Sequence, residues 1–178
     1  PAICRLSELR ILNLSYCGLN GSILPAIGDL SRLELLDLSN NQLSGNIPQE
    51  ICRLSKLKEL YLQRNEQLSG NIPAEIWKLS NLITLNFYLN QLSGSIPSGL
   101  WSLTGLESLN LRRNRLEGGI PPEIGGMSHL NELNLYGNRL TGDIPAETGR
   151  LANLRELDLG GNQLSGDIPP ELGLLPNL

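Results

Sequence analysis

Leucines recur along the chain in short alternating runs, and each run is followed by a turn. In the unit from residues 33 to 54, Leu36 and Leu38 lie on one side of the segment 34–40, and mostly polar residues lie on the other. A period of two residues predicts a strand with one buried face. The segment 49–54 is too short for a regular α-helix, so we expect a 3₁₀ turn there.

The same context, Leu-x-x-Leu-x-Leu-x-x-Asn, recurs along the whole chain. Its units start at Leu9, Leu33, Leu57, Leu82, Leu106, Leu130 and Leu154. The step is 24 residues throughout, except for 25 between the third and fourth units, where the segment 65–70 has one residue more. One such unit cannot bury its own apolar face, but stacked units share a core. We therefore expect seven parallel strands at about 4.8 Å per coil, in a single domain over residues 1–178.

The Asn that ends each pattern stands where the coil must turn a corner. An inward Asn offers two donors and an acceptor to backbone groups that lack strand partners. We interpret this column as a structural ladder and not as a ligand site. Its members are Asn41, Asn65, Asn90, Asn114, Asn138 and Asn162, with Cys17 in the first unit. After the ladder, Gly45 permits a tight bend, and Ile47 and Pro48 return the chain to an extended path.

The pattern LxxLxLxxNxLSGxIPxxIGxL, present as LRELDLGGNQLSGDIPPELGLL over residues 154–175, resembles the plant-specific class of leucine-rich repeats. The SGxIP half separates this class from shorter ones. The resemblance covers essentially the whole chain. It implies an α/β-type repeat solenoid: a right-handed superhelix with a parallel concave β-sheet, a short second sheet and 3₁₀ turns on the convex side.

The chain is similar to receptor-kinase ectodomains and polygalacturonase-inhibiting proteins. The family usually has cysteine-bearing terminal caps, and neither is recognisable here. Pro1 to Cys4 align with Pro25 to Gly28, so we expect the sequence to begin within a coil. A fragment, an engineered excision and a chain whose ends are covered by something else all fit that expectation.

The three cysteines are an odd number. Cys4 and Cys52 share a column two coils apart, roughly 10 Å at about 4.8 Å per coil, which exceeds the Cα separation of a disulfide. Cys17 occupies the Asn position, so we expect it to be buried. Three free thiols are the result. The resemblance implies an extracellular or cell-surface protein, while unpaired thiols leave a cytoplasmic location open.

A net charge of −4 argues against nucleic acid as a partner, since phosphate binding needs a basic surface. No apolar run approaches the roughly 18 residues of a membrane span. Two Asn-x-Ser sequons make Asn13 and Asn20 candidate glycosylation sites. A glycan on Asn13 would block the concave side of the first coil.

The outward-facing strand positions gather all four tyrosines of the chain. Tyr and Arg are enriched at binding hot spots, and several cluster in coils three to six beside the acidic Glu59, Glu132 and Glu156. We predict that a peptide or protein ligand binds here. The alternative is that Tyr is present because it favours strands and that Arg is present because it is solvated at the surface. The predicted ligand-binding residues are Tyr61, Gln63, Arg64, Tyr88, Arg112, Arg113 and Tyr136.

We expect no catalytic site, metal or cofactor. His129 is the one histidine and cannot build a metal site alone, no Cys pair has zinc spacing, and no Ser or Cys has a base beside it. Two other functions remain open: a structural scaffold without a ligand, and ice binding through the Asn/Asp central column, which Tyr61 interrupts. The oligomeric state is left open.

Trp77 and Trp101 share the column that Gly holds in other coils. We expect them on the outer side, stacked on each other over neighbouring leucines. The alternative is an exposed apolar contact surface.

Overall fold

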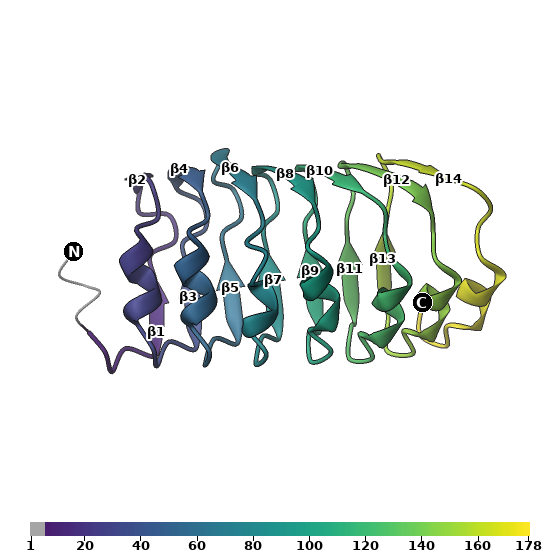
Figure 1. Ribbon diagram of the computed structural model, residues 1–178, viewed down its shortest axis with the longest axis horizontal. Coiled ribbons are helices and arrows are strands. Elements are labelled where there is room, and N and C mark those ends of the chain that lie inside the picture. Colours follow the sequence, from purple (N-terminus) through teal and green to yellow (C-terminus); the bar gives the residue numbers. More distant parts are fainter. Residues whose placement is uncertain (1–5) are drawn as a thin grey trace.

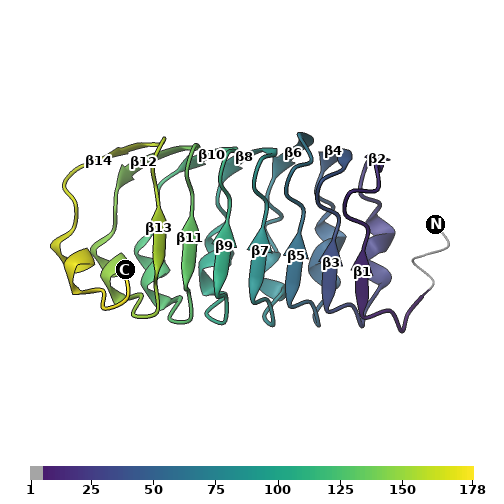
Figure 2. The same ribbon diagram turned by 180° about the vertical axis from the view of Figure 1, so that it is seen from behind.

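The computed structural model describes residues 6–178 and consists of stacked coils with a parallel sheet along each of two faces (Figures 1 and 2). The first sheet is β1 (Ile11–Asn13), β3 (Leu35–Asp37), β5 (Glu59–Tyr61), β7 (Thr84–Asn86), β9 (Ser108–Asn110), β11 (Glu132–Asn134) and β13 (Glu156–Asp158), paired in that order. Each coil adds one strand, in register with the last, so Leu36, Leu60 and Leu85 are direct neighbours. The expected solenoid with a parallel sheet is confirmed.

The second sheet runs beside the first and uses the Leu-Ser-Gly half of each unit. Its strands are β2 (Asn20–Gly21), β4 (Gln42–Asn46), β6 (Gln67–Asn71), β8 (Gln91–Ser95), β10 (Arg115–Gly118), β12 (Arg139–Asp143) and β14 (Gln163–Ser165). Gly is required here by a positive φ and by a close neighbour. Gly70 has a φ of 75°, and a Cβ on it would lie 2.3 Å from Asn46 Oδ1.

3₁₀ helices cover the face opposite the first sheet (Figure 1). They are η2 (Pro25–Asp29), η3 (Gln49–Arg53), η4 (Ile76–Lys78), η5 (Ser98–Ser102), η6 (Pro122–Gly126), η7 (Ala146–Arg150) and η8 (Pro170–Leu174). The prediction of a 3₁₀ turn after each SGxIP segment is thus confirmed. We call the face of β1 to β13 the concave face and the face of the 3₁₀ helices the convex face.

The core is a set of leucine columns between these layers. Leu36, Leu60, Leu85 and Leu109 are fully buried, one above the other. Phe87 replaces Leu in its column and is also fully buried. Burying each Leu stabilises the fold by about 2 kcal/mol, and neighbouring coils provide most of the contacts.

One expectation about burial is wrong. Cys17 is exposed, because no coil among the described residues packs on the outer side of the first one, whereas later members of the column are covered from both sides. Ser39, although at an outward position, is 2% exposed and accepts a hydrogen bond from Asn40 Nδ2 over 3.0 Å. Cys4 lies outside the described residues; Cys52 is a free, buried thiol, and burial, followed by the charge of Glu75, raises its pKa to about 11.

Candidate functional site

The Asn ladder forms the inner wall next to the concave strands. Asn114 Nδ2 donates to the carbonyls of Phe87 (2.9 Å) and Leu111 (3.1 Å), and its Oδ1 accepts from the N–H of Leu92 (3.0 Å). The same contacts recur at Asn41, Asn65, Asn138 and Asn162. Asn90 differs, because its Oδ1 accepts from the N–H of Asn65, next to the extra residue of the 25-residue unit.

The central outward column, at the last residue of each concave strand, is also structural. Its Asn and Asp side chains accept a hydrogen bond from the N–H two residues later, as in Asn86 to Tyr88 (3.1 Å) and Asn110 to Arg112 (3.2 Å). The same bond forms at Asn13, Asp37, Asn134 and Asp158. Tyr61 interrupts this column and lacks an acceptor in that position, so its coil departs from the structural pattern.

The last outward column turns the chain through a left-handed conformation. Its φ values run from 52° at Arg113 to 68° at Gly137, and Tyr16, Asn40, Arg64, Leu89 and Gly161 share this conformation. Only Gly, and to a lesser degree Asn, adopts it without strain. Sequence reasoning missed this feature, although Asn40, Gly137 and Gly161 in one column were the available indication. Arg64 and Arg113 therefore project from strained backbone.

Arg and Tyr side chains stack along the concave face, three of them from the column between these two and one, Arg64, from the left-handed column. The Arg112 guanidinium lies 4.7 Å from the Tyr136 ring centre and 5.9 Å from that of Tyr88. Arg64 lies 5.7 Å from the same Tyr88 ring. All three contacts are within the roughly 6 Å range of cation–π interactions. We call Arg64, Tyr88, Arg112 and Tyr136 the Arg–Tyr stack.

One end of the Arg–Tyr stack opens onto bare backbone. A Cβ on Gly160 would lie 3.1 Å from Tyr136 Cδ2, and one on Gly161 would lie 3.4 Å from its Cζ. The Tyr136 ring therefore rests on this Gly pair, and the neighbouring coil adds no side chain to cover it. At the other end, Gln63 Oε1 is buried without a hydrogen-bond partner.

Positive charge on this surface is not neutralised locally. Within residues 6–178, Arg64, Arg112 and Arg113 form no ion pair with a carboxylate. Arg112 Nε is buried between the rings and has no hydrogen-bond partner. A guanidinium held in this way by aromatic faces loses little side-chain entropy when it binds an anionic or carbonyl oxygen.

The remaining predicted site residues are placed differently. Tyr61 is half-buried, and its hydroxyl donates to Glu59 Oε2 over 2.8 Å. Burial, and after it this carboxylate, raise the Tyr61 pKa to about 12. Arg113 is exposed and lies beside Gly137, outside the Arg–Tyr stack. Seven predicted residues thus resolve into a stack of four, with Tyr61, Gln63 and Arg113 around it.

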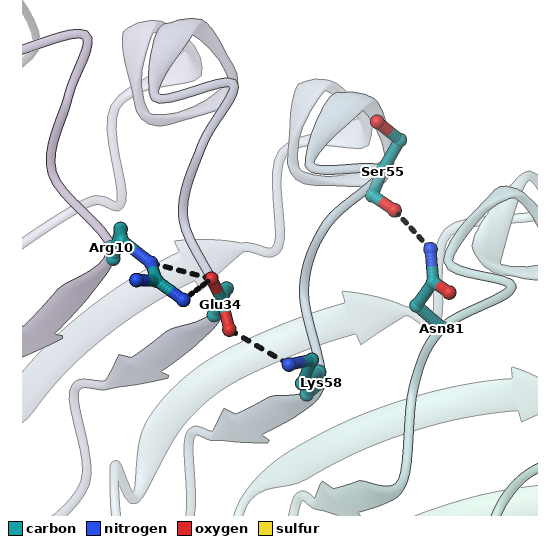
Figure 3. Close-up of polar contacts among 5 residues, drawn as sticks. All are labelled: Arg10, Glu34, Ser55, Lys58 and Asn81. Atoms are coloured by element: carbon teal, nitrogen blue, oxygen red, sulfur yellow. Dashed lines mark hydrogen bonds and ion pairs between the residues drawn. The ribbon is translucent and has the colours of Figure 1, made fainter.

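At the start of the concave strands, ion pairs join successive coils. Glu34 accepts from Arg10 Nε over 2.6 Å and from Lys58 Nζ over 2.8 Å, so it bridges three coils (Figure 3). Lys58 first, then Arg10, lowers the pKa of Glu34. Nearby, Asn81 Nδ2 donates to the Ser55 carbonyl over 2.7 Å. His129 occupies the same position two coils on, with Nδ1 3.0 Å from the Thr104 carbonyl, which is an inter-coil contact.

The remaining candidate features are glycosylation sites, metal sites and membrane-spanning helices. Asn13 and Asn20 are both exposed in the first described coil, and their glycosylation stays a prediction. Residues 6–178 contain no group of three or more His, Cys, Asp or Glu side chains arranged to hold a metal ion. In the same range, no helix has the length and hydrophobicity to cross a bilayer.

Family comparisons agree with this architecture. Models described as leucine-rich repeats match residues 7–66, 81–103, 105–127 and, as two copies, 128–177. The chain is a leucine-rich-repeat protein. A comparison with curated protein sequences gives no match.

Solved structures extend the likeness to plant receptors. The repeat chain is 40% identical to the ectodomain of the Arabidopsis thaliana membrane receptor kinase GASSHO1/SCHENGEN3, in complex with CASPARIAN STRIP INTEGRITY FACTOR 2, with a TM-score of 0.94 over 99% of this chain and 21% of that one. It is 42% identical to the Arabidopsis receptor kinase HAESA, in complex with the peptide hormone IDA and the co-receptor SERK1, with a TM-score of 0.95 over 98% and 29%. The chain thus spans less than a third of either receptor structure.

A third leucine-rich-repeat structure is a plant ice-binding protein. Its identity to this chain is 28%, with a TM-score of 0.71 over 94% of this chain and 61% of that one. The repeat fold is therefore shared by peptide-hormone receptors and an ice-binding protein, and the outward columns must distinguish between such functions.

Proposed function

We propose that this chain is a non-catalytic, extracellular interaction module that binds a peptide or protein on its concave face. The observation that carries the proposal is the Arg–Tyr stack, in which Arg112 lies between Tyr88 and Tyr136 with no carboxylate partner of its own. The structure of HAESA in complex with the peptide hormone IDA supports a peptide as the ligand class.

The chemistry of the stack favours a particular kind of peptide. Its aromatic faces offer flat apolar area, and the guanidiniums offer donors for backbone carbonyls or an acidic group. The Gly160–Gly161 backbone supports one side of the Tyr136 ring and adds no side chain of its own to the surface beside it. An extended peptide with an acidic group near Arg112 satisfies these features.

The alternative functions receive less support. Ice binding requires a flat, regular array of small polar groups. The Asn and Asp oxygens of the central column instead accept hydrogen bonds from backbone N–H groups. The bulky Arg–Tyr stack also lies beside them. A scaffold without a ligand leaves the three unpaired arginines unexplained.

Selection from a random peptide library displayed on phage tests the proposal. We expect enriched peptides to bind the wild-type chain and to lose at least tenfold in affinity with Tyr88→Ala, Arg112→Ala or Tyr136→Ala, because hot-spot residues contribute about 1.4 kcal/mol or more. Lys56→Ala, exposed and outside the stack, is the matched control. Failure to enrich any peptide that depends on the stack would favour the scaffold, and thermal hysteresis would establish ice binding instead.

A further inference from the structure

Neighbouring 3₁₀ helices on the convex face pack at two different distances. The distance depends on which residue occupies one column of the repeat. In this column, Gly28, Gly125 and Gly149 lie against the backbone of the next coil. A Cβ on these residues would come within 2.3 Å of the Glu50 carbonyl oxygen, 2.9 Å of the Glu147 oxygen and 2.6 Å of the Glu171 oxygen, respectively. No side chain fits at these distances without moving the coils apart.

Three consecutive coils nevertheless place side chains in that column. They are Cys52, Trp77 and Trp101, and both Cys52 and Trp101 are only 2% exposed. Trp77 is half-exposed and lies on Gly99, where a Cβ would be 2.7 Å from its Cδ1. Other described coils mostly have Glu at the position of Gly99, so a small residue there makes room for the indole.

The packing of neighbouring 3₁₀ helices differs between coils that meet across Gly and coils that meet across Trp101. The pairs η2/η3, η6/η7 and η7/η8, which meet across Gly, pack closely, whereas η5 and η6, which meet across Trp101, pack less closely. Helices η5 and η6 have the same length as η7, so length does not explain the difference. The pairs that involve η4 do not allow this comparison, because η4 has three residues and not five.

The concave strands show no matching change. β5, β7, β9 and β11 pair in one unbroken register, three residues to a pair. Coils that open on the convex face while their strands stay hydrogen-bonded must tilt toward the concave face. Side chains that project from the concave face then converge over these coils.

We propose that Trp101 is a positioning residue that bends the solenoid behind the Arg–Tyr stack and holds Tyr88 within reach of Arg112. Trp101 lies between the coils of Tyr88 and Arg112. The contact between these two residues, at 5.9 Å, is near the limit for cation–π attraction, so a small loss of tilt removes it.

The contact between Arg112 and Tyr136 provides an internal control. These coils meet across Gly125, without an inserted side chain, and Arg112 approaches Tyr136 to 4.7 Å. This contact therefore forms without an inserted side chain behind it. A change at Trp101 should therefore affect one face of the Arg112 guanidinium and spare the other.

The test is nuclear Overhauser spectroscopy of the whole chain, comparing wild type with Trp101→Gly. We expect loss of the Tyr88–Arg112 cross-peaks, retention of the Tyr136–Arg112 cross-peaks, and new contacts between η5 and η6 as these helices close. Trp101→Phe, which keeps a ring between the coils, should retain both sets. Unchanged Tyr88–Arg112 cross-peaks in Trp101→Gly would overturn the proposal.

A reciprocal variant covers the case in which Trp101→Gly does not fold. Gly125→Ala should push η6 from η7, increase the tilt behind Arg112 and Tyr136, and shift the Arg112 side-chain N–H resonance further upfield. An unchanged resonance would equally overturn the proposal. The relevance of this geometry to binding rests on the proposed function, but the measurement needs no ligand, so failure of the peptide selection and failure of the bending proposal are distinguishable.

Discussion

Two columns of the concave side, two residues apart in each coil, follow opposite rules. The Asn ladder keeps one residue type from Asn41 to Asn162, and each amide is tied to backbone groups of two coils. The column of Tyr88, Arg112 and Tyr136 differs in almost every coil and makes side-chain contacts. A repeat fold thus separates its tasks by column: constant positions satisfy the backbone, and variable positions are free for recognition.

Two other outward columns, the central Asn/Asp column and the left-handed column, combine features of both kinds. The central Asn/Asp column faces outward, yet its side chains accept backbone N–H groups. The left-handed column varies freely in sequence, yet its backbone conformation is constant. Outward direction and sequence variation therefore do not by themselves identify a binding residue; the contacts do.

Removing one rung of the Asn ladder should give the largest effect on stability. Asn114→Ala leaves the N–H of Leu92 without a partner in a buried site, and it removes one of the two amide donors from each of the carbonyls of Phe87 and Leu111. The unpaired N–H costs about 1–3 kcal/mol and each lost carbonyl bond about 0.5–1.5 kcal/mol, so we expect the free energy of unfolding to fall by about 4 kcal/mol in urea titrations. Asn110→Ala, in the same coil but facing outward with one backbone bond, should cost about 1 kcal/mol. Equal losses in the two variants would contradict the division by column.

The left-handed column should respond to Gly in both directions. Gly137→Ala places a Cβ at a φ of 68° and should lower the free energy of unfolding by about 1 kcal/mol. Leu89→Gly relieves the same strain, at a φ of 55°, and should exceed Leu89→Ala in stability by about 1 kcal/mol in urea titrations. The Ala variant is the control, because it loses the side chain but keeps the strained backbone. If Leu89→Ala proved the more stable of the two, this column would not be strained.

The Arg–Tyr stack should contribute less to stability than either constant column. A double-mutant cycle of Arg112→Ala and Tyr136→Ala should give a coupling energy of about 0.5–1 kcal/mol, as expected for a partly exposed cation–π pair. The control cycle, Arg64→Ala with Tyr136→Ala, joins two members of the stack that do not touch each other and should give a value near zero. A coupling above about 2 kcal/mol would make the stack primarily a structural element.

Much of the fold follows from the sequence because each rule is repeated in every coil. The buried leucines, the ladder and the 3₁₀ segments are local consequences of one 24-residue pattern. Cys17 was misplaced because its burial depends on a neighbouring coil and not on its own column. The choice of Tyr88, Arg112 and Tyr136 could be made from composition and direction. Their stacking could not, since it depends on rotamers and on how far neighbouring coils tilt.

The smallest expected effect concerns the pKa of Tyr61. It tests whether the hydroxyl of this predicted site residue is buried and bonded to Glu59. Burial first and the bond to Glu59 second raise its pKa to about 12, from a model-compound value of 10.0. Between these two pH values the folded chain holds a proton that the unfolded chain has released, so its contribution to stability is complete below pH 10 and declines as pH rises toward 12. Ultraviolet titration of tyrosinate absorbance should therefore show one late transition that disappears in Tyr61→Phe. Tyr16→Phe, which removes an exposed phenol, is the matched control and should keep that transition. If the late transition persisted in Tyr61→Phe, another tyrosine would have the raised pKa. The Tyr61 hydroxyl would then be free to contact a ligand.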